Sequence, residues 1–217
     1  ALPFVRMRAV PPPWPAPIRY PLVLATTALG RIAPGPGYRG WDAAHRHHRS
    51  ALAQVIASAP HVIVANDWQT LPIAVRAQQE TGAAIVADLH EYGPLQFESR
   101  AAWMALVAPM IDYHLRAAAP HLAAAMTVNR TIADKYGEEY GIACQVVRNV
   151  PAVRCQASLR RTDPRAIRIV HHGNASRERR LDILIEAIAR TEQRFSLHLR
   201  LIEQDRRELA QLRRLAR

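Results

Sequence analysis

The chain has 217 residues, 49% of them hydrophobic, and a formal net charge of +11. This length is enough to bury one large hydrophobic core or two small ones. The sequence contains no run of about 18 apolar residues, which argues against a membrane-spanning helix, and the N-terminus lacks the regions of a signal peptide. Two cysteines do not make a disulfide framework. We therefore expect a globular, cytoplasmic protein.

The positive charge is carried almost entirely by arginine, because Lys135 is the single lysine among the 29 basic residues. The planar guanidinium group suits phosphate, so nucleic acids, anionic lipids and nucleotides are candidate ligands. Acidic residues are interspersed among the arginines, and no aromatic residues alternate with them as in proteins that stack on bases. The sequence thus argues against nucleic-acid binding and leaves a peripheral contact with the anionic inner face of a membrane as a possibility.

Taken in chain order, the first forty residues are rich in proline and glycine, which predicts surface loops rather than long regular elements. From Trp41 the apolar residues have helical spacing. Short β-branched runs then alternate with helical segments. The predicted strands are "HVIVAND", "AAIVADLHE", "AAMTVN" and "CQVVRNV", and the helix that begins at "LPIAV" should end at Gly82.

This alternation is typical of a doubly wound α/β domain with a parallel sheet. Ligands of such sheets bind outside the carboxyl ends of the strands. Polar side chains follow three of the predicted strands at that edge: Asn66 and Asp67, then Asp88, His90 and Glu91, then Asn129. We therefore expect these groups to line a ligand site.

A polar, proline-containing segment interrupts this pattern before a new strand, "IRIVHHG", a helix, a further strand and a basic helix. We predict an N-terminal Rossmann-like domain over residues 1–153 whose first strand is missing, a linker over 154–166, and the truncated beginning of a second Rossmann-like domain over 167–217.

Five motifs occur in an order that resembles a known family: "VIVANDWQTLPIAV", "IVADLHEY", "AMTVNRTIADKYGEEYG", "VVRNVP" and "IVHHGNASRERRLDILIEAI". Together they resemble the retaining nucleotide-sugar glycosyltransferases of family 4, which have the two-domain GT-B fold. The resemblance covers about residues 62–189. It implies an acceptor-side N-terminal domain, a nucleotide-sugar-binding C-terminal domain, and transfer of a sugar to an acceptor hydroxyl with retention of configuration.

The resemblance places His90 in the cleft between the two domains, near the donor sugar, and makes it the first candidate for a catalytic role. Side chains alternate along a strand, so Asp88 shares a face with His90 and is its expected partner, whereas Glu91 points away. Asp67 and Glu91 are assigned to the acceptor side of the cleft. Helix capping is an equally good interpretation of Asp67, and it is the favoured one for Asn129.

In the second domain, Gly173 permits a close approach of the backbone to an anion, and the helix that follows offers free amides. The family commonly places an arginine directly after this glycine and a lysine a few residues later, both of which bind the nucleotide diphosphate. Here these positions are Asn174 and Arg179. No metal and no cofactor are expected, because the nucleotide sugar is the substrate.

The same residues leave two alternatives open. The glutamate pair with which the family grips sugar and ribose has no counterpart before Arg217, and Asn174 replaces an expected arginine. A noncatalytic, glycosyltransferase-like partner subunit is therefore the first alternative, and a nucleotide-sugar epimerase of GT-B architecture is the second. The sequence does not identify the sugar, the nucleotide or the acceptor, which can be a lipid-linked molecule, a polysaccharide or a small molecule.

Overall fold

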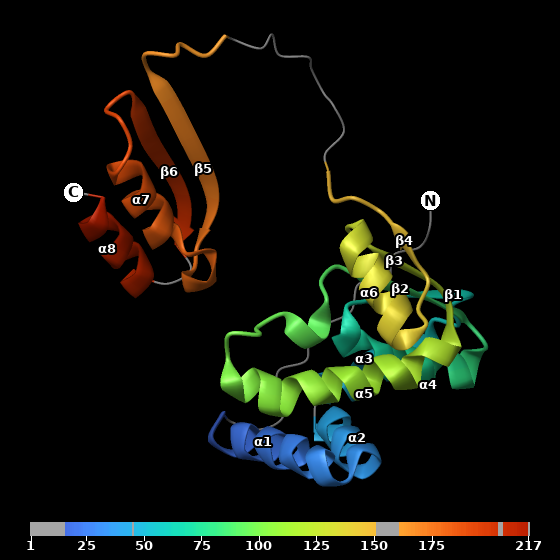
Figure 1. The fold of residues 1–217 in the computed structure, drawn as a ribbon. Coiled ribbons are helices and arrows are strands. Elements are labelled where there is room, and N and C mark those ends of the chain that lie inside the picture. The colour runs from blue at the N-terminus through green and yellow to red at the C-terminus, as the bar shows by residue number, and fades with distance from the viewer. Residues whose placement is uncertain (1–15, 45, 151–160, 204–205, 217) are drawn as a thin grey trace. The chain divides into compact units, whose positions relative to one another are not determined.

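A computed structural model describes residues 16–44, 46–150, 161–203 and 206–216. The chain forms two compact units, residues 1–151 and 152–217, which are treated separately below (Figure 1). Within the described segments, no helix combines the length and the apolar character needed to cross a membrane.

Unit 1 is built on four parallel strands, β1 (Val62–Asn66), β2 (Ala84–Leu89), β3 (Leu122–Thr127) and β4 (Cys144–Val146). They lie in the order β1-β2-β3-β4, so each described strand pairs with its neighbour in sequence. The predicted α/β class and parallel sheet are confirmed. The order does not reverse within these four strands, so the carboxyl ends of neighbouring strands lie next to one another along one edge.

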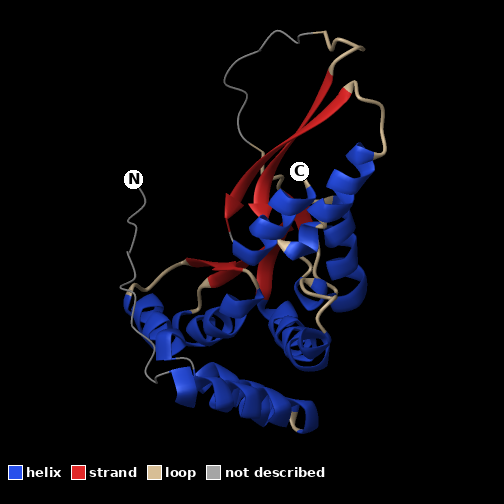
Figure 2. Ribbon diagram, turned by 90° about the vertical axis from the view of Figure 1, so that its left-hand side faces the viewer, coloured by secondary structure: helices blue, strands red, loops and turns tan. Residues whose placement is uncertain are grey.

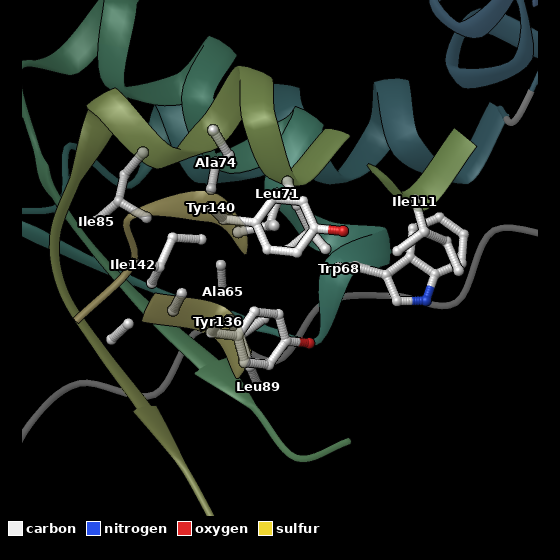
Figure 3. Close-up of a cluster of buried hydrophobic side chains, with 14 of the residues drawn as sticks. Ala65, Trp68, Leu71, Ala74, Ile85, Leu89, Ile111, Tyr136, Tyr140 and Ile142 are labelled. Atoms are coloured by element: carbon white, nitrogen blue, oxygen red, sulfur yellow. The ribbon is translucent and has the colours of Figure 1, made fainter. Parts of the chain in front are cut away.

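Three crossover helices, α4 (Leu71–Thr81), α5 (Ala108–Ala118) and α6 (Arg130–Tyr140), contribute to one core with the sheet. Short helical turns lie in the connections between these strands and helices: η1 (Trp68–Thr70), η2 (Gly93–Leu95), η3 (Trp103–Val107) and η4 (Ala119–His121). Figure 3 shows this core, in which apolar side chains of β1 and β2 meet those of the helices. Its buried members include Ala65, Leu71, Ala74, Ile85, Leu89, Ile111, Tyr136, Tyr140 and Ile142.

Only one face of the four-stranded sheet is covered by the described residues. Ile85, Ala87 and Leu89 alternate inward along β2 and are buried, whereas Val62 and Val64 on β1 are 54% and 60% exposed. Asp88 lies on the same open side as the half-buried residues of β2, because successive side chains point to opposite faces. The candidate polar residues are therefore not enclosed by the helical layer.

The ends of two crossover helices follow the predicted chemistry. Gly82 ends α4 in the left-handed conformation, with φ of 71°. Asn129 begins α6, and its side chain accepts a hydrogen bond from the amide of Ile132 at 2.9 Å. The interpretation of Asn129 as a helix cap is confirmed.

The prediction of loops is wrong for residues 16–40, and residues 1–15 lie outside the described residues. The structure has helices α1 (Ala16–Ile32) and α2 (Pro34–Ala44), followed by α3 (Arg46–Ala57). Glycine here serves close packing: a Cβ on Gly37 would lie 2.4 Å from the Cα of Gly30, and one on Gly30 would lie within 2.0 Å of the Tyr38 ring. Tertiary contact between α1 and α2 outweighs the low helix propensity of glycine and proline.

Unit 2 contains two parallel strands, β5 (Ile167–Ala175) and β6 (Phe195–Glu203), with helices α7 (Leu181–Ala189) and α8 (Arg206–Leu215) and the turn η5 (Arg177–Arg179) (Figure 2). Its small core joins Ala175, Leu181, Ile185 and Leu212. Most of the linker predicted over residues 154–166, and Cys155, lie outside the described residues.

Candidate functional site

The structure joins the two residues first proposed for chemistry. His90 follows the last residue of β2, and its Nε2 atom lies 3.1 Å from Oδ2 of Asp88. The Asp88 side chain is 23% exposed and the His90 side chain 47%, so the pair is open to a ligand while Nε2 lies beside the carboxylate. A carboxylate in this position selects the ring orientation and the tautomer of a histidine. The pairing follows from strand alternation, as expected.

Asp67 lies beside this pair and is tied to β2 at two points. Its amide donates to the carbonyl oxygen of Asp88 at 2.8 Å, and its Oδ1 atom accepts from the amide of His90 at 3.3 Å. Its backbone has φ of 59° and ψ of 166°, which is rare for a residue with a side chain. Such strain persists where surrounding contacts fix it, often at functional sites.

The helix-cap interpretation of Asp67 is wrong. Neither Asp67 nor Thr70 makes a side-chain hydrogen bond to the first amides of η1 or α4. Instead, the Thr70 hydroxyl donates to the carbonyl oxygens of Asn66 and Asp67 at 2.9 and 3.0 Å. The carboxylate of Asp67 is thereby left to hold the backbone of His90, and the residue connects β1 to the end of β2.

Tyr136 anchors the loop that follows His90, a role that the sequence did not indicate. Its hydroxyl donates to the carbonyl oxygen of Glu91 at 2.7 Å and accepts from the amide of Gly93 at 3.3 Å. Burial raises the pKa of Tyr136, so it remains a neutral donor. The sequence feature that could have indicated this is the spacing of Tyr136 and Tyr140. They are one helical turn apart, which places both on the core face of α6.

Glu91 is the weakest member of the predicted set. It is exposed, and among the described residues its side chain makes no hydrogen bond or ion pair; only its backbone is held, by Tyr136. Next along the loop, Tyr92 borders an open hollow of about 380 Å³ whose wall also includes Asp112, Glu139 and Tyr140. The hydroxyl of Tyr92 donates a hydrogen bond to Glu139. The pKa of Tyr92 is raised, mainly by burial and next by this hydrogen bond.

In unit 2 the predicted phosphate-binding residues are only partly brought together. Gly173 has φ of +150°, and a Cβ there would lie 3.8 Å from both Cζ and Nη1 of Arg179. Asn174 is the next residue of β5, so its side chain projects to the opposite face of the strand. The structure thus brings Gly173 and Arg179 together and separates Asn174 from them.

The predicted use of the α7 amides by an anion is opposed by an acid of the chain, because Asp182 places a negative charge in the first turn of the helix. The carboxylate of Asp182 is paired with Arg180 at 3.0 Å. The hydrogen bond from Arg180 lowers the pKa of Asp182. Arg180 is therefore engaged within the chain, whereas Arg179 makes no ion pair with any described residue.

In the described segments, no group of three or more His, Cys, Asp or Glu residues has a geometry that could hold a metal ion. Comparison of the sequence with protein-family models and with curated proteins found no match.

Proposed function

We propose that the protein is a retaining glycosyltransferase of GT-B type, which moves a sugar from a nucleotide-diphosphate sugar to an acceptor hydroxyl. One observation carries the proposal: Nε2 of His90 and Oδ2 of Asp88 lie 3.1 Å apart as an accessible pair at the carboxyl edge of a parallel sheet, where such folds bind ligands. The backbone tie from Asp67 to His90 adds support, because it fixes the position of the ring.

In this proposal the bond between the sugar C1 and the diphosphate oxygen breaks, a bond from the acceptor oxygen to C1 forms, and the hydroxyl proton is released. His90 contacts the sugar or the acceptor hydroxyl, and Asp88 orients the imidazole. In unit 2, Arg179 stabilises the negative charge on the departing nucleoside diphosphate, next to the open backbone at Gly173. No metal ion takes part in the proposed reaction.

The acceptor is a hydroxyl compound whose class is left open. The hollow beside Tyr92 supports a sugar-containing acceptor, since its wall combines the rings of Tyr92 and Tyr140 with the carboxylates of Asp112 and Glu139. Aromatic faces and hydrogen-bond acceptors are the groups that suit a carbohydrate.

The test is to incubate the protein with a panel of UDP-, GDP- and ADP-sugars, with and without candidate acceptors, and to measure release of the nucleoside diphosphate. We expect release with one nucleotide, faster when the acceptor is present. If no donor binds and none is consumed, the proposal is wrong.

One observation favours a noncatalytic partner subunit as the second candidate. The carboxylate of Asp182 lies in the first turn of α7, where its negative charge opposes the binding of a diphosphate. A protein of this kind would bind a nucleotide without consuming the sugar donor. Nucleotide binding without turnover, together with restored activity when a catalytic subunit is added, would favour it.

A further inference from the structure

His171 has a buried nitrogen without a partner close to the candidate phosphate-binding residues. It lies on β5, two residues before Gly173, and therefore on the same face of the strand. Its Nε2 atom is inaccessible to solvent and makes no hydrogen bond to any described residue. Buried polar atoms nearly always have a partner, so an unpartnered one next to a candidate site calls for a ligand.

The imidazole and a guanidinium border the same small space. A Cβ on Gly173 would lie 3.7 Å from Nε2 of His171 and 3.8 Å from Nη1 of Arg179. The space exists because residue 173 has no side chain, and its φ of +150° is one that residues with side chains rarely adopt. Two nitrogen donors from different parts of the chain thus converge on the place that a side chain would occupy.

The charges around this space favour an anion. Arg179 makes no ion pair with any described residue, while the nearest engaged arginine, Arg180, binds Asp182 through three hydrogen bonds of 3.0 to 3.3 Å. The three heavy atoms nearest to a Cβ on Gly173 all belong to His171 and Arg179, and none of them is a carboxylate oxygen. An oxygen of a phosphate group would accept from both nitrogens at once.

We propose that His171 is a phosphate ligand of this site: its Nε2–H donates to an oxygen of the diphosphate that Arg179 also binds. The proposal rests on the proposed function, which gives unit 2 a nucleoside diphosphate. The side chain of Asn174 lies on the other face of β5, and His171 supplies a donor on the face that Gly173 and Arg179 border.

The test compares two neighbouring histidines on opposite faces of β5. Binding of inorganic pyrophosphate, and separately of UDP, GDP and ADP, is measured by calorimetry for the wild type, His171→Leu, His171→Gln and the control His172→Leu. We expect His171→Leu to bind the preferred ligand on the order of tenfold more weakly, His171→Gln to recover part of the loss, and His172→Leu to match the wild type. Tight binding of pyrophosphate alone would indicate a general phosphate site, and a preference for one nucleoside diphosphate a nucleotide site.

A second measurement covers the case in which His171→Leu fails to fold. The ¹⁵N resonance of Nε2 of His171 in the wild type should shift on addition of pyrophosphate, while that of His172 should not. Unchanged resonances, unchanged affinity in a folded His171→Leu variant, or no binding of any of these ligands by the wild type would each overturn the proposal. If pyrophosphate binding depends on His171 but no sugar is transferred, the phosphate site stands and the glycosyltransferase proposal fails.

Discussion

The candidate groups of the two units differ in how their hydrogen-bonding capacity is met. At the end of β2, Asp67, Asp88 and His90 bind one another or the local backbone. At the end of β5, His171 and Arg179 approach each other, and neither has a partner among the described residues. Groups that bind one another are held in place for chemistry, whereas the buried Nε2 of His171 is left for a ligand to bind. We therefore propose reaction geometry for unit 1 and anion binding for unit 2.

The largest effect should come from removing the imidazole of unit 1. We expect His90→Ala to lower the rate of sugar transfer roughly 100- to 10,000-fold, because a positioned acid–base group contributes about that factor. Pyrophosphate affinity should stay the same, since the phosphate-binding groups belong to unit 2. Glu91→Ala is the matched comparison, because the Glu91 side chain is exposed and unpartnered in the described chain, and it should lower the rate far less than His90→Ala. Turnover that survives in His90→Ala would remove the catalytic role.

Acid should destabilise unit 1 through His114, which is 5% exposed and packs beside Trp68. Burial lowers the pKa of His114 from 6.5 to about 4, so the unfolded chain binds a proton more readily. Its contribution to stability is therefore complete above pH 6.5 and is lost as the pH falls toward 4. The free energy of unfolding should decrease by about 3 kcal/mol over that interval.

Tryptophan fluorescence measures this change in unit 1 alone, because all four tryptophans lie before residue 152. Urea unfolding at several pH values between 7 and 4 should show the loss in the wild type and a much smaller one in His114→Phe. Asp42 does not interfere with this measurement. Burial would raise the pKa of Asp42, but the hydrogen bond from His48 outweighs it and the pKa is lowered. The contribution of Asp42 to stability is therefore lost mainly below pH 4. An equal pH dependence in His114→Phe would contradict the assignment.

The sequence predicted the elements of the sheet better than it predicted the N-terminal helices, for a physical reason. The strand "IVADL" and the cap at Asn129 depend on neighbours within a few residues, so local pattern was sufficient. Helices α1 and α2 depend on Gly30 and Gly37 meeting across a helix pair, a contact that pattern does not reveal. Proline and glycine therefore indicated loops where tertiary packing stabilises helices.

The candidate sites divide in the same way. The pairing of Asp88 with His90 follows from the alternation of one strand, and the structure contains it. The tie from Asp67 to the His90 backbone and the approach of His171 to Arg179 join residues that are distant in sequence or separated by a loop. Their partners are set by the register of β1 with β2 and by the fold of the β5–α7 loop, which the sequence pattern alone did not specify.

Replacing Asp67 should show how far the geometry of unit 1 depends on a strained backbone. We expect Asp67→Ala to lower the free energy of unfolding by about 1–2 kcal/mol, because it loses a hydrogen bond and keeps a positive φ. Asp67→Gly also lacks the carboxylate, but glycine adopts the positive φ without strain. It should therefore be more stable than Asp67→Ala and equally impaired in sugar transfer. Chemical denaturation and initial rates separate the two effects. Equal stability of the two variants would show that the backbone strain is unimportant.

The smallest effect distinguishes two adjacent arginines of unit 2. Arg179→Ala should weaken pyrophosphate binding about tenfold and leave the melting temperature unchanged, because its guanidinium has no ion pair in the described structure to lose. Arg180→Ala should leave the affinity unchanged and shift the melting temperature slightly, because its side chain holds Asp182. Calorimetry gives the pyrophosphate affinity of each variant, and thermal unfolding gives its melting temperature. The reverse pattern would mean that Arg180 leaves Asp182 when phosphate binds, and unit 2 would then resemble unit 1 in presenting groups that are already paired.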